Sequence, residues 1–472
     1  MDLGRMNHIL EVNEDLGYAV IEPGVTQGQL YAYLAEHHPN LWMDATGAGL
    51  ASSFVGNTLD RGFGHTRYGD HFLSTCSMEA VLADGRVLRT GYGHYERAKA
   101  LRAYRYGVGP FLDGLFAQSN LGIVTQIGLW LMPAPEAFCA YFFSVPEHAQ
   151  VATLIDRIGK LRMQGLLQST VHIANDLRTI SARMRYPWHR TGGQAPLPED
   201  LRATLRREIG IGAWNGCGGI YGTRGTVAAT RKALRHALRG TGARLVFVDD
   251  RKLALAHRAQ RLLALVGAGG RLGDLLDTVE PVYQLLKGIP NDDALKGATW
   301  RVRAAAQIPD APGGPTTSDS PAPAVPVSGA GDGPAPGGQD LLDTHAGIMW
   351  VSPVVPARGP AALEVLAIVE PIYARFGFEA LITFTMITER AMCCVTNLAF
   401  DTRVAEEAAR AQACYEALVP ALMQAGYQPY RTGPHGYKKL AAGSTVFWEV
   451  VRELKATLDP GGIISPGRYE AW

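Results

Sequence analysis

The chain has 472 residues and nearly equal numbers of basic and acidic side chains, 45 and 44, so a nucleic acid is not an expected partner, because neutralising phosphates needs a basic excess. Hydrophobic residues make up 47% of the sequence, yet no segment approaches the roughly 20 consecutive apolar residues that span a bilayer, and MDLGRMNHILEV does not read as a signal peptide. Six cysteines without CxxC pairs or zinc-ligand spacing predict reduced thiols, a cytoplasmic location and no metal site.

The first part of the chain alternates short strands and helices. Residues 17–26 (GYAVIEPGVT) predict a strand that ends in a Pro-Gly turn, and residues 27–38 place apolar side chains at helical spacing. Residues 77–91 predict a hairpin with its turn at Asp84 and Gly85. Residues 109–133 predict a helix, a break at Gly122 and then a strand that ends at Pro133.

The pattern changes after Pro133. Residues 138–161 and 220–238 each predict a strand followed by a helix, so a second α+β unit is expected from about residue 136. Residues 311–340 are nearly half Pro and Gly, which predicts a disordered surface loop. Two strands are expected around a turn at 387–390, then a helix over 405–426. The glycine-rich tail, 459–472, is expected to lie against another part of the protein.

Three groups of residues suggest chemistry, although each also has an ordinary structural explanation. The small-residue loop TGAGLASSFVGNT (46–58) leaves backbone N–H groups approachable by a pyrophosphate or a flat ring, or is simply a turn. Asp70 beside His71 suits a general base, although capping is commoner for an isolated Asp. Tyr430 and Arg431 together could donate to an anionic oxygen, although an Arg stacked on a surface Tyr is commoner.

Taken together, these segments resemble one known family. DLGRMNHILEV, YAVIEPGVTQGQLYAYL, VGNTLDRGFGHTRYGDHF, GPFLDGLFAQSNLGIVTQIGLWLMP, PYRT and DPGGIISPGRY are similar to the vanillyl-alcohol oxidase and 4-cresol dehydrogenase branch of the FAD-linked oxidases. The resemblance covers nearly the whole chain outside residues 311–340 and implies an α+β fold. It implies a PCMH-type FAD-binding domain in residues 1–135, an antiparallel-sheet cap domain in 136–425, and a segment, 426–472, that returns to the FAD-binding domain.

The resemblance also implies a function. A para-substituted phenol would bind its oxygen at Tyr430 and Arg431, a hydride would leave its benzylic carbon for flavin N5, and Asp70 would act at that carbon. The electron acceptor would be O₂ or a cytochrome-like carrier, and relatives suggest a homodimer. Residues implied to contact FAD are Pro23, Gly24, Gly47, Gly49, Ser52, Ser53, Gly56, Asn57, Gly62, Tyr68, Gly69, Gly122, Ile123, Val124 and, more loosely, Arg468.

Two departures from the family pattern lead to further expectations. The chain begins where relatives already carry a glycine-rich loop for the FAD diphosphate and a second phenol-binding tyrosine, so we hypothesise an N-terminal truncation from a misplaced start codon. Many relatives attach FAD through a His or Tyr in the region that here spans residues 383–401. That region has neither, and Cys393 and Cys394 stand near the attachment position. Buried small residues are the usual role of strand cysteines, so non-covalent FAD is expected.

Two other functions compete with phenol oxidation. The same flavoenzyme fold could act on a hydroxy acid or a sugar lactone, although such substrates would call for carboxylate-binding Arg or Lys and a His base. The chain could also be an inactive truncated scaffold without cofactor.

Overall fold

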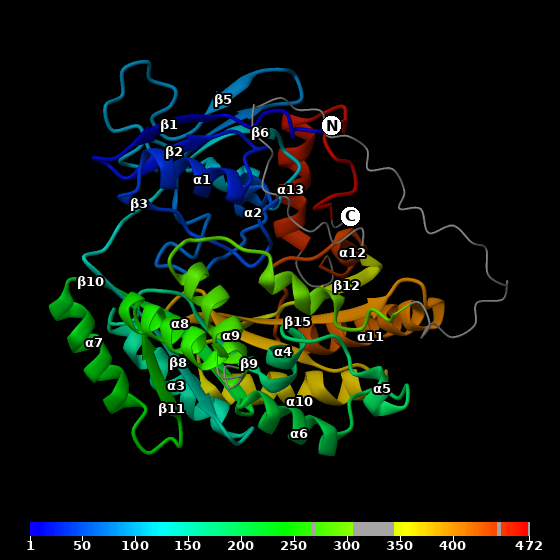
Figure 1. Ribbon diagram of the computed structural model, residues 1–472. Helices are drawn as coiled ribbons and strands as arrows, with labels where there is room; N and C mark the ends of the chain where they lie inside the picture. Colours follow the sequence, from blue (N-terminus) through cyan, green and yellow to red (C-terminus); the bar gives the residue numbers. More distant parts are fainter. Residues whose placement is uncertain (266–269, 305–343, 441–444, 471–472) are drawn as a thin grey trace, which may run out of the picture.

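The computed structural model describes residues 1–265, 270–304, 344–440 and 445–470, which form an upper and a lower layer, each built on an antiparallel sheet (Figure 1). The disordered loop predicted over 311–340 lies outside the described residues. Antiparallel sheets accompanied by helices confirm the predicted α+β class. None of the helices in the described ranges combines the length and the apolar character needed to cross a membrane.

The upper layer contains the sheet β1-β2-β6-β4-β5. Its strands are β1 (Ile9–Asn13), β2 (Tyr18–Ile21), β4 (Thr75–Val81), β5 (Val87–Arg89) and β6 (Ile123–Trp130). The small pair β3 (Leu41–Trp42) and β7 (Met132–Pro133) adjoins it, with helices α1 (Gln27–His37) and α2 (Phe54–Leu59). The C-terminal helix α13 (Thr445–Leu458) lies beside this layer, although the long helix that precedes it in the chain, α11 (Ala405–Gln424), belongs to the lower layer (Figure 1).

The predicted elements of this layer are mostly confirmed. Helix α1 begins where expected, because the Thr26 hydroxyl accepts a hydrogen bond from the backbone N–H of Gln29 and caps the helix. The hairpin β4–β5 forms with Gly85 in the left-handed region (φ +85°). The helix predicted after residue 109 was wrong: only a 3₁₀ turn, η1 (Asp113–Phe116), forms. Gly114 weakens helix there, and Gln118 turns the chain with φ +51°.

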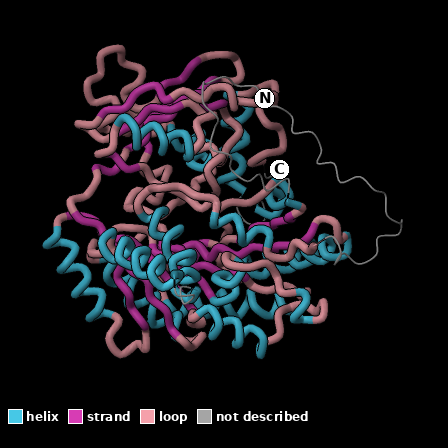
Figure 2. Tube along the Cα trace, viewed as in Figure 1, coloured by secondary structure: helices cyan, strands magenta, loops and turns pink. Residues whose placement is uncertain are grey.

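The lower layer contains the sheet β11-β8-β10-β9-β14-β15-β12, and β13 pairs with β15. Its strands are β8 (Ala137–Val145), β9 (Val171–Asn175), β10 (Trp214–Gly222), β11 (Arg244–Val248), β12 (Ala346–Val351), β13 (Val354–Pro356), β14 (Leu381–Met386) and β15 (Ala391–Asp401). The helices and 3₁₀ turns that accompany it include α3 (Gln150–Met163), α4 (Asp176–Ser181), α5 (Trp188–Thr191), α6 (Glu199–Ile209), α7 (Arg224–Ala237), α8 (Asp250–Leu265), α9 (Gly270–Leu286), η2 (Asp293–Thr299), α10 (Gly359–Arg375) and α11 (Ala405–Gln424). Most of the helices lie in the lower half of the molecule, together with this sheet (Figure 2).

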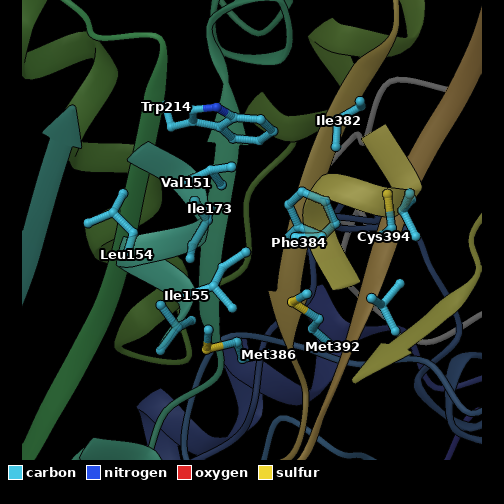
Figure 3. Close-up of a cluster of buried hydrophobic side chains, with 14 of the residues drawn as sticks. Val151, Leu154, Ile155, Ile173, Trp214, Ile382, Phe384, Met386, Met392 and Cys394 are labelled. Carbon is cyan, nitrogen blue, oxygen red and sulfur yellow. The ribbon is translucent and has the colours of Figure 1, made fainter. Parts of the chain in front are cut away.

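The two faces of the lower sheet differ. Helices α3, α7, α10 and α11 pack against one face, and this interface is a continuous apolar core. Ile173, Phe384 and Cys394 point into it (Figure 3). Because side chains alternate along a strand, their neighbours His172, Thr385 and Cys393 lie on the opposite face, which we call the open face.

The strands predicted around residues 387–390 and the helix predicted from residue 405 are confirmed as β14, β15 and α11. Helix α13 was missed, although TVFWEVVRELKATL carries apolar residues at helical spacing. Two short elements, η5 (Pro434–Gly436) and α12 (Tyr437–Leu440), follow the Tyr430–Arg431 segment. The domain limits after residues 135 and 425 remain predictions.

Candidate active site at the junction of the two layers

A row of polar side chains crosses the open face of the lower sheet. In register across neighbouring strands lie Cys217 of β10, His172 of β9, Thr385 of β14 and Cys393 of β15. His172 contacts the Thr385 hydroxyl through Nδ1 at 3.1 Å. A polar row on a buried sheet face is unusual unless something polar covers it.

A loop of the upper layer covers this row. The His65 ring stacks on the His172 ring with centroids 4.2 Å apart. The Thr170 hydroxyl donates to the Gly64 carbonyl at 2.6 Å, and the Thr170 backbone N–H donates to the Thr66 carbonyl. Burial lowers the pKa of both histidines, that of His172 well below its usual value, so the stacked rings are neutral. The loop and strand β9 therefore meet through a tight, uncharged contact.

Tyr430 and Arg431 lie where this junction reaches the edge strands. The backbone N–H of Tyr430 donates to the Ser352 carbonyl at 3.0 Å, and the Cys393 thiol approaches the same carbonyl at 3.7 Å. The Arg431 guanidinium lies 5.1 Å from the Tyr430 ring centroid. Among the described residues, neither the Tyr430 hydroxyl nor the Arg431 guanidinium has a hydrogen-bond or ion-pair partner. Burial raises the pKa of Tyr430 above its usual value, against the opposing effect of Arg431, so the phenol is a proton donor.

Asp70 is joined to this pair through one intervening residue. Phe63 forms an antiparallel bridge with Asp70, and its ring lies 5.7 Å from the Tyr430 ring. One Asp70 oxygen, Oδ1, accepts from the Leu73 backbone N–H at 3.0 Å, as a turn cap. Asp70 also lines a cavity of about 410 Å³ together with Arg67 and Thr170, but Tyr430 and Arg431 do not line it. The structure thus brings the three predicted catalytic residues to one junction without direct contact between Asp70 and the pair.

The C-terminal tail closes the other side of the junction. Gln118 donates from Nε2 to the carbonyls of Tyr430 (2.9 Å) and Asp60 (3.2 Å). The Asp60 carboxylate in turn accepts from the Tyr469 hydroxyl and lies 3.4 Å from the Arg468 guanidinium. The tail therefore lies against the upper layer, as the sequence predicted, and two residues, Asp60 and Gln118, link Arg468 to Tyr430.

The glycines of this region approach other protein atoms closely. A side-chain carbon at Gly62 would lie 2.0 Å from Asn57 Oδ1, and one at Gly69 would lie 2.4 Å from a methyl carbon of Thr170. Packing inside the protein thus already explains why these positions are glycine. Their predicted approach to FAD remains a prediction.

The other predicted cofactor residues lie in the upper layer. Ser53 caps α2 and donates to the Pro23 carbonyl at 2.6 Å. Gly47 and Gly49 approach Ala294 and Leu295 of η2, so this loop is covered by the lower layer. The remaining positions stand on β2–α1, on α2 and its preceding loop, beside Asp70, and at the start of β6: Gly24, Ser52, Gly56, Tyr68, Gly122, Ile123 and Val124. Their roles are not tested by these contacts and stay predictions.

Sequence reasoning missed several residues of the junction. His65 and His172 are far apart in sequence, and only the docking of the two layers pairs them. Gln118 gave no signal, because its left-handed backbone is not visible in the sequence. Asp44, buried beside His71, could have been noticed as an acid in an otherwise apolar segment, LWMDA.

The donors at the junction fit a flavin. FAD and an aromatic substrate present anionic or carbonyl oxygens, which require N–H and O–H donors. Tyr430 and Arg431 offer such donors unpaired, next to a covered sheet face. Cys394 points into the apolar core, so of the two candidate attachment cysteines only Cys393 faces the junction.

Comparisons with known proteins agree with this reading. Residues 1–91 match the FAD binding domain family. The chain is 36% identical over 471 residues to 1'-carboxy-chondrochloren decarboxylase of Chondromyces crocatus, covering 100% of this chain and 81% of that protein. It is 28% identical over 471 residues to the 4-cresol dehydrogenase (hydroxylating) flavoprotein subunit of Pseudomonas putida, covering 99% of this chain and 78% of that one.

The fold agrees as well. The solved structure of 4-ethylphenol oxidase from Gulosibacter chungangensis, in its isoeugenol complex, matches with a TM-score of 0.82 at 27% identity, covering 100% of this chain and 80% of that one. The chain therefore belongs to the vanillyl-alcohol oxidase and 4-cresol dehydrogenase family of FAD-dependent oxidoreductases, with FAD as its cofactor.

Proposed function

We propose that this protein oxidises a para-substituted phenol (a 4-hydroxybenzylic alcohol, a 4-alkylphenol or a 4-allylphenol) at its benzylic carbon. The observation that carries the proposal is the adjacent, unpaired pair of donors, the Tyr430 hydroxyl and the Arg431 guanidinium. Two donors that both reach a phenol oxygen would stabilise a phenolate more than a phenol, as an oxyanion site does. A hydroxy acid would instead need a basic histidine, and burial lowers the pKa of both junction histidines.

The proposed reaction uses these residues in order. The phenol releases its proton to solvent as its oxygen settles between Tyr430 and Arg431. The phenolate then pushes electron density through the ring, a hydride leaves the benzylic carbon, and a p-quinone methide remains. FAD supplies the acceptor for that hydride. Asp70 takes the proton released when water adds to the methide carbon, which gives a 4-hydroxybenzylic alcohol.

The two electrons then leave the protein on O₂ or on a cytochrome-like carrier. One relative is named an oxidase and another a dehydrogenase, so the proposal covers either acceptor. It also includes non-covalent FAD, because Cys393, the cysteine that faces the junction, has its pKa raised by burial and is held as an unreactive thiol.

Anaerobic mixing of the FAD-loaded protein with 4-ethylphenol tests the proposal. We expect the absorbance of oxidised flavin to disappear at a rate that increases with phenol concentration. Tyr430→Phe and Arg431→Met should each lower that rate by roughly 10²–10³-fold, the usual effect of removing one oxyanion donor. Tyr427→Phe is the matched control, because the Tyr427 hydroxyl donates to Glu364 at 2.6 Å, away from the pair. A flavin that no 4-alkylphenol reduces would overturn the proposal.

The decarboxylase relative favours a second candidate within the same chemistry. If the substrate carries a carboxylate on the carbon next to the benzylic one, the quinone methide can lose CO₂. The electrons of the broken C–C bond then form an alkene and restore the phenolate, so the step balances without a further oxidant. A 3-(4-hydroxyphenyl)propanoate probe tests this candidate: one CO₂ released per flavin reduced supports it, and flavin reduction without CO₂ excludes it.

A further inference from the structure

The residue after Asp70 is anchored in the interior. His71 is 2% exposed, and both its ring nitrogens face side-chain oxygens: Nε2 lies 2.6 Å from Asp44 Oδ2, and Nδ1 lies 2.7 Å from Asn57 Oδ1. The ring also stacks on Phe54, with centroids 4.9 Å apart and an interplanar angle of 22°. A buried imidazole with contacts on both nitrogens and on one face has a single orientation available.

The same Asp44 carboxylate holds the other end of the segment. Its second oxygen, Oδ1, accepts from the Thr66 backbone N–H at 2.6 Å, and Asp44 is only 4% exposed. One buried carboxylate therefore ties residue 66 to residue 71, and Asp70 lies between these two points. We call Asp44, Asn57, Thr66 and His71 the Asp44 clamp.

Asp70 itself has weaker attachments. Its backbone is bridged to Phe63, its carbonyl accepts from the Ser74 backbone N–H at 3.1 Å, and its Oδ1 accepts from the Leu73 backbone N–H. Asp70 is half-buried and lines the cavity, whereas the clamp is buried beneath it. The direction of the Asp70 carboxylate is thus set by the segment that carries it, because hydrogen bonds to a buried, charged acceptor are stronger than turn contacts near the surface.

We propose that the Asp44 clamp is a positioning device for Asp70, with His71 and Asp44 as positioning residues in the reaction. This inference rests on the proposed role of Asp70 at the benzylic carbon. Reactive groups misplaced by about 1 Å can lose roughly 10²-fold in rate, while substrate affinity, which depends on other contacts, need not change. Loss of the clamp should therefore lower kcat and leave KM nearly constant.

The test uses the FAD-loaded full chain with four variants. His71→Ala and Asp44→Ala remove the clamp, and His71→Gln keeps a donor that can reach Asp44. His38→Ala is the matched control, because His38 makes the same 2.6 Å contact to a carboxylate, that of Glu14, on the surface. We expect kcat with 4-ethylphenol to fall by roughly 10–10²-fold in both Ala variants, at unchanged KM, to recover at least in part in His71→Gln, and to stay at the wild-type value in His38→Ala.

Hydrogen–deuterium exchange provides a readout that does not depend on activity. In His71→Ala, the amides of residues 64–74 should exchange about tenfold faster, with strand β6 unchanged. Wild-type kcat and wild-type exchange in both Ala variants would overturn the inference, and so would a KM increase that accounts for the whole loss of kcat/KM. If the wild-type protein does not oxidise phenols, the proposed function fails on its own, and local exchange alone then decides whether the clamp orders the Asp70 segment.

Discussion

Gly64→Ala should destabilise the upper layer strongly, although it adds only one carbon. That carbon would lie 1.5 Å from Asp44 Oδ2, 2.6 Å from Asp44 Cγ and 2.7 Å from the Ala45 carbonyl oxygen. No rotation of the alanine relieves the overlap, so the Asp44 carboxylate has to move. It then loses its bonds to the Thr66 N–H and the His71 ring. Bonds to a charged group contribute about 1.5–3 kcal/mol each, so we expect a loss of roughly 3–6 kcal/mol.

Urea unfolding of the FAD-loaded protein measures this effect. A chain of this size need not unfold in one step, so the probe has to report on the layer that contains Gly64. The release of FAD, detected as a rise in flavin fluorescence, provides that probe. Gly114→Ala is the control: the added carbon meets no atom within 4 Å, so its effect should stay within about 0.5 kcal/mol. A Gly64→Ala protein as stable as Gly114→Ala would refute the packing described for Asp44.

Three further predictions concern the lower layer and the cofactor. Arg301→Met should destabilise the lower layer by about 3–5 kcal/mol in urea unfolding, because the Arg301 guanidinium, 1% exposed, lies 3.7 Å from the buried Glu379 carboxylate, which would lose this neighbouring cation. A smaller effect than that of the surface change Arg224→Met would contradict this prediction. Burial holds the pKa of His172 well below 6.5, so below pH 6.5 the unfolded chain binds more protons than the folded protein. The free energy of unfolding should therefore fall by up to about 1.4 kcal/mol for each pH unit of acidification. Between pH 6.5 and about pH 5.5, His172→Asn should lose less stability than the wild type, and an equal loss would contradict this prediction. Acid precipitation should release the flavin into the supernatant, whereas colour kept in the pellet that disappears in Cys393→Ser would show a covalent link.

The sequence allowed the local elements to be predicted where one signal dominated. The helix from Gln27, the Asp84–Gly85 turn and the β-branched strands around residues 387–390 each depend on neighbouring residues, and each formed as expected. The helix expected after residue 109 did not form: the chain makes only the 3₁₀ turn η1, and Gln118 beyond it has a left-handed backbone and bonds the Tyr430 carbonyl 312 residues away, features that neighbouring residues do not reveal.

In the candidate site, too, residues in local motifs could be predicted, whereas contacts between the two layers could not. Asp70, Tyr430 and Arg431 were predicted through motifs, and the structure brings them to one junction. The glycines of the Val55–Gly69 stretch were expected to make room for a cofactor, whereas Gly62 and Gly69 first make room for Asn57 and Thr170. The His65–His172 stack could not be predicted, because it exists only once the open face of the lower sheet is covered.

In the centre of the lower sheet, one strand is synthesised long before one of its pairing partners. Strand β9 pairs with β10, which follows it closely, but its other neighbour is β14, and the Asn175 side chain bonds a carbonyl 205 residues further on. At roughly 5–20 residues per second, the free edge of β9 waits about 10–40 seconds for its partner. During that interval a β8–β10–β9 sheet presents the unpaired backbone groups of β9, and the side of α3 on which α10 later packs is uncovered. The yield of folded protein in a cell should therefore depend on chaperones that shield this edge, and on translation speed between residues 175 and 381.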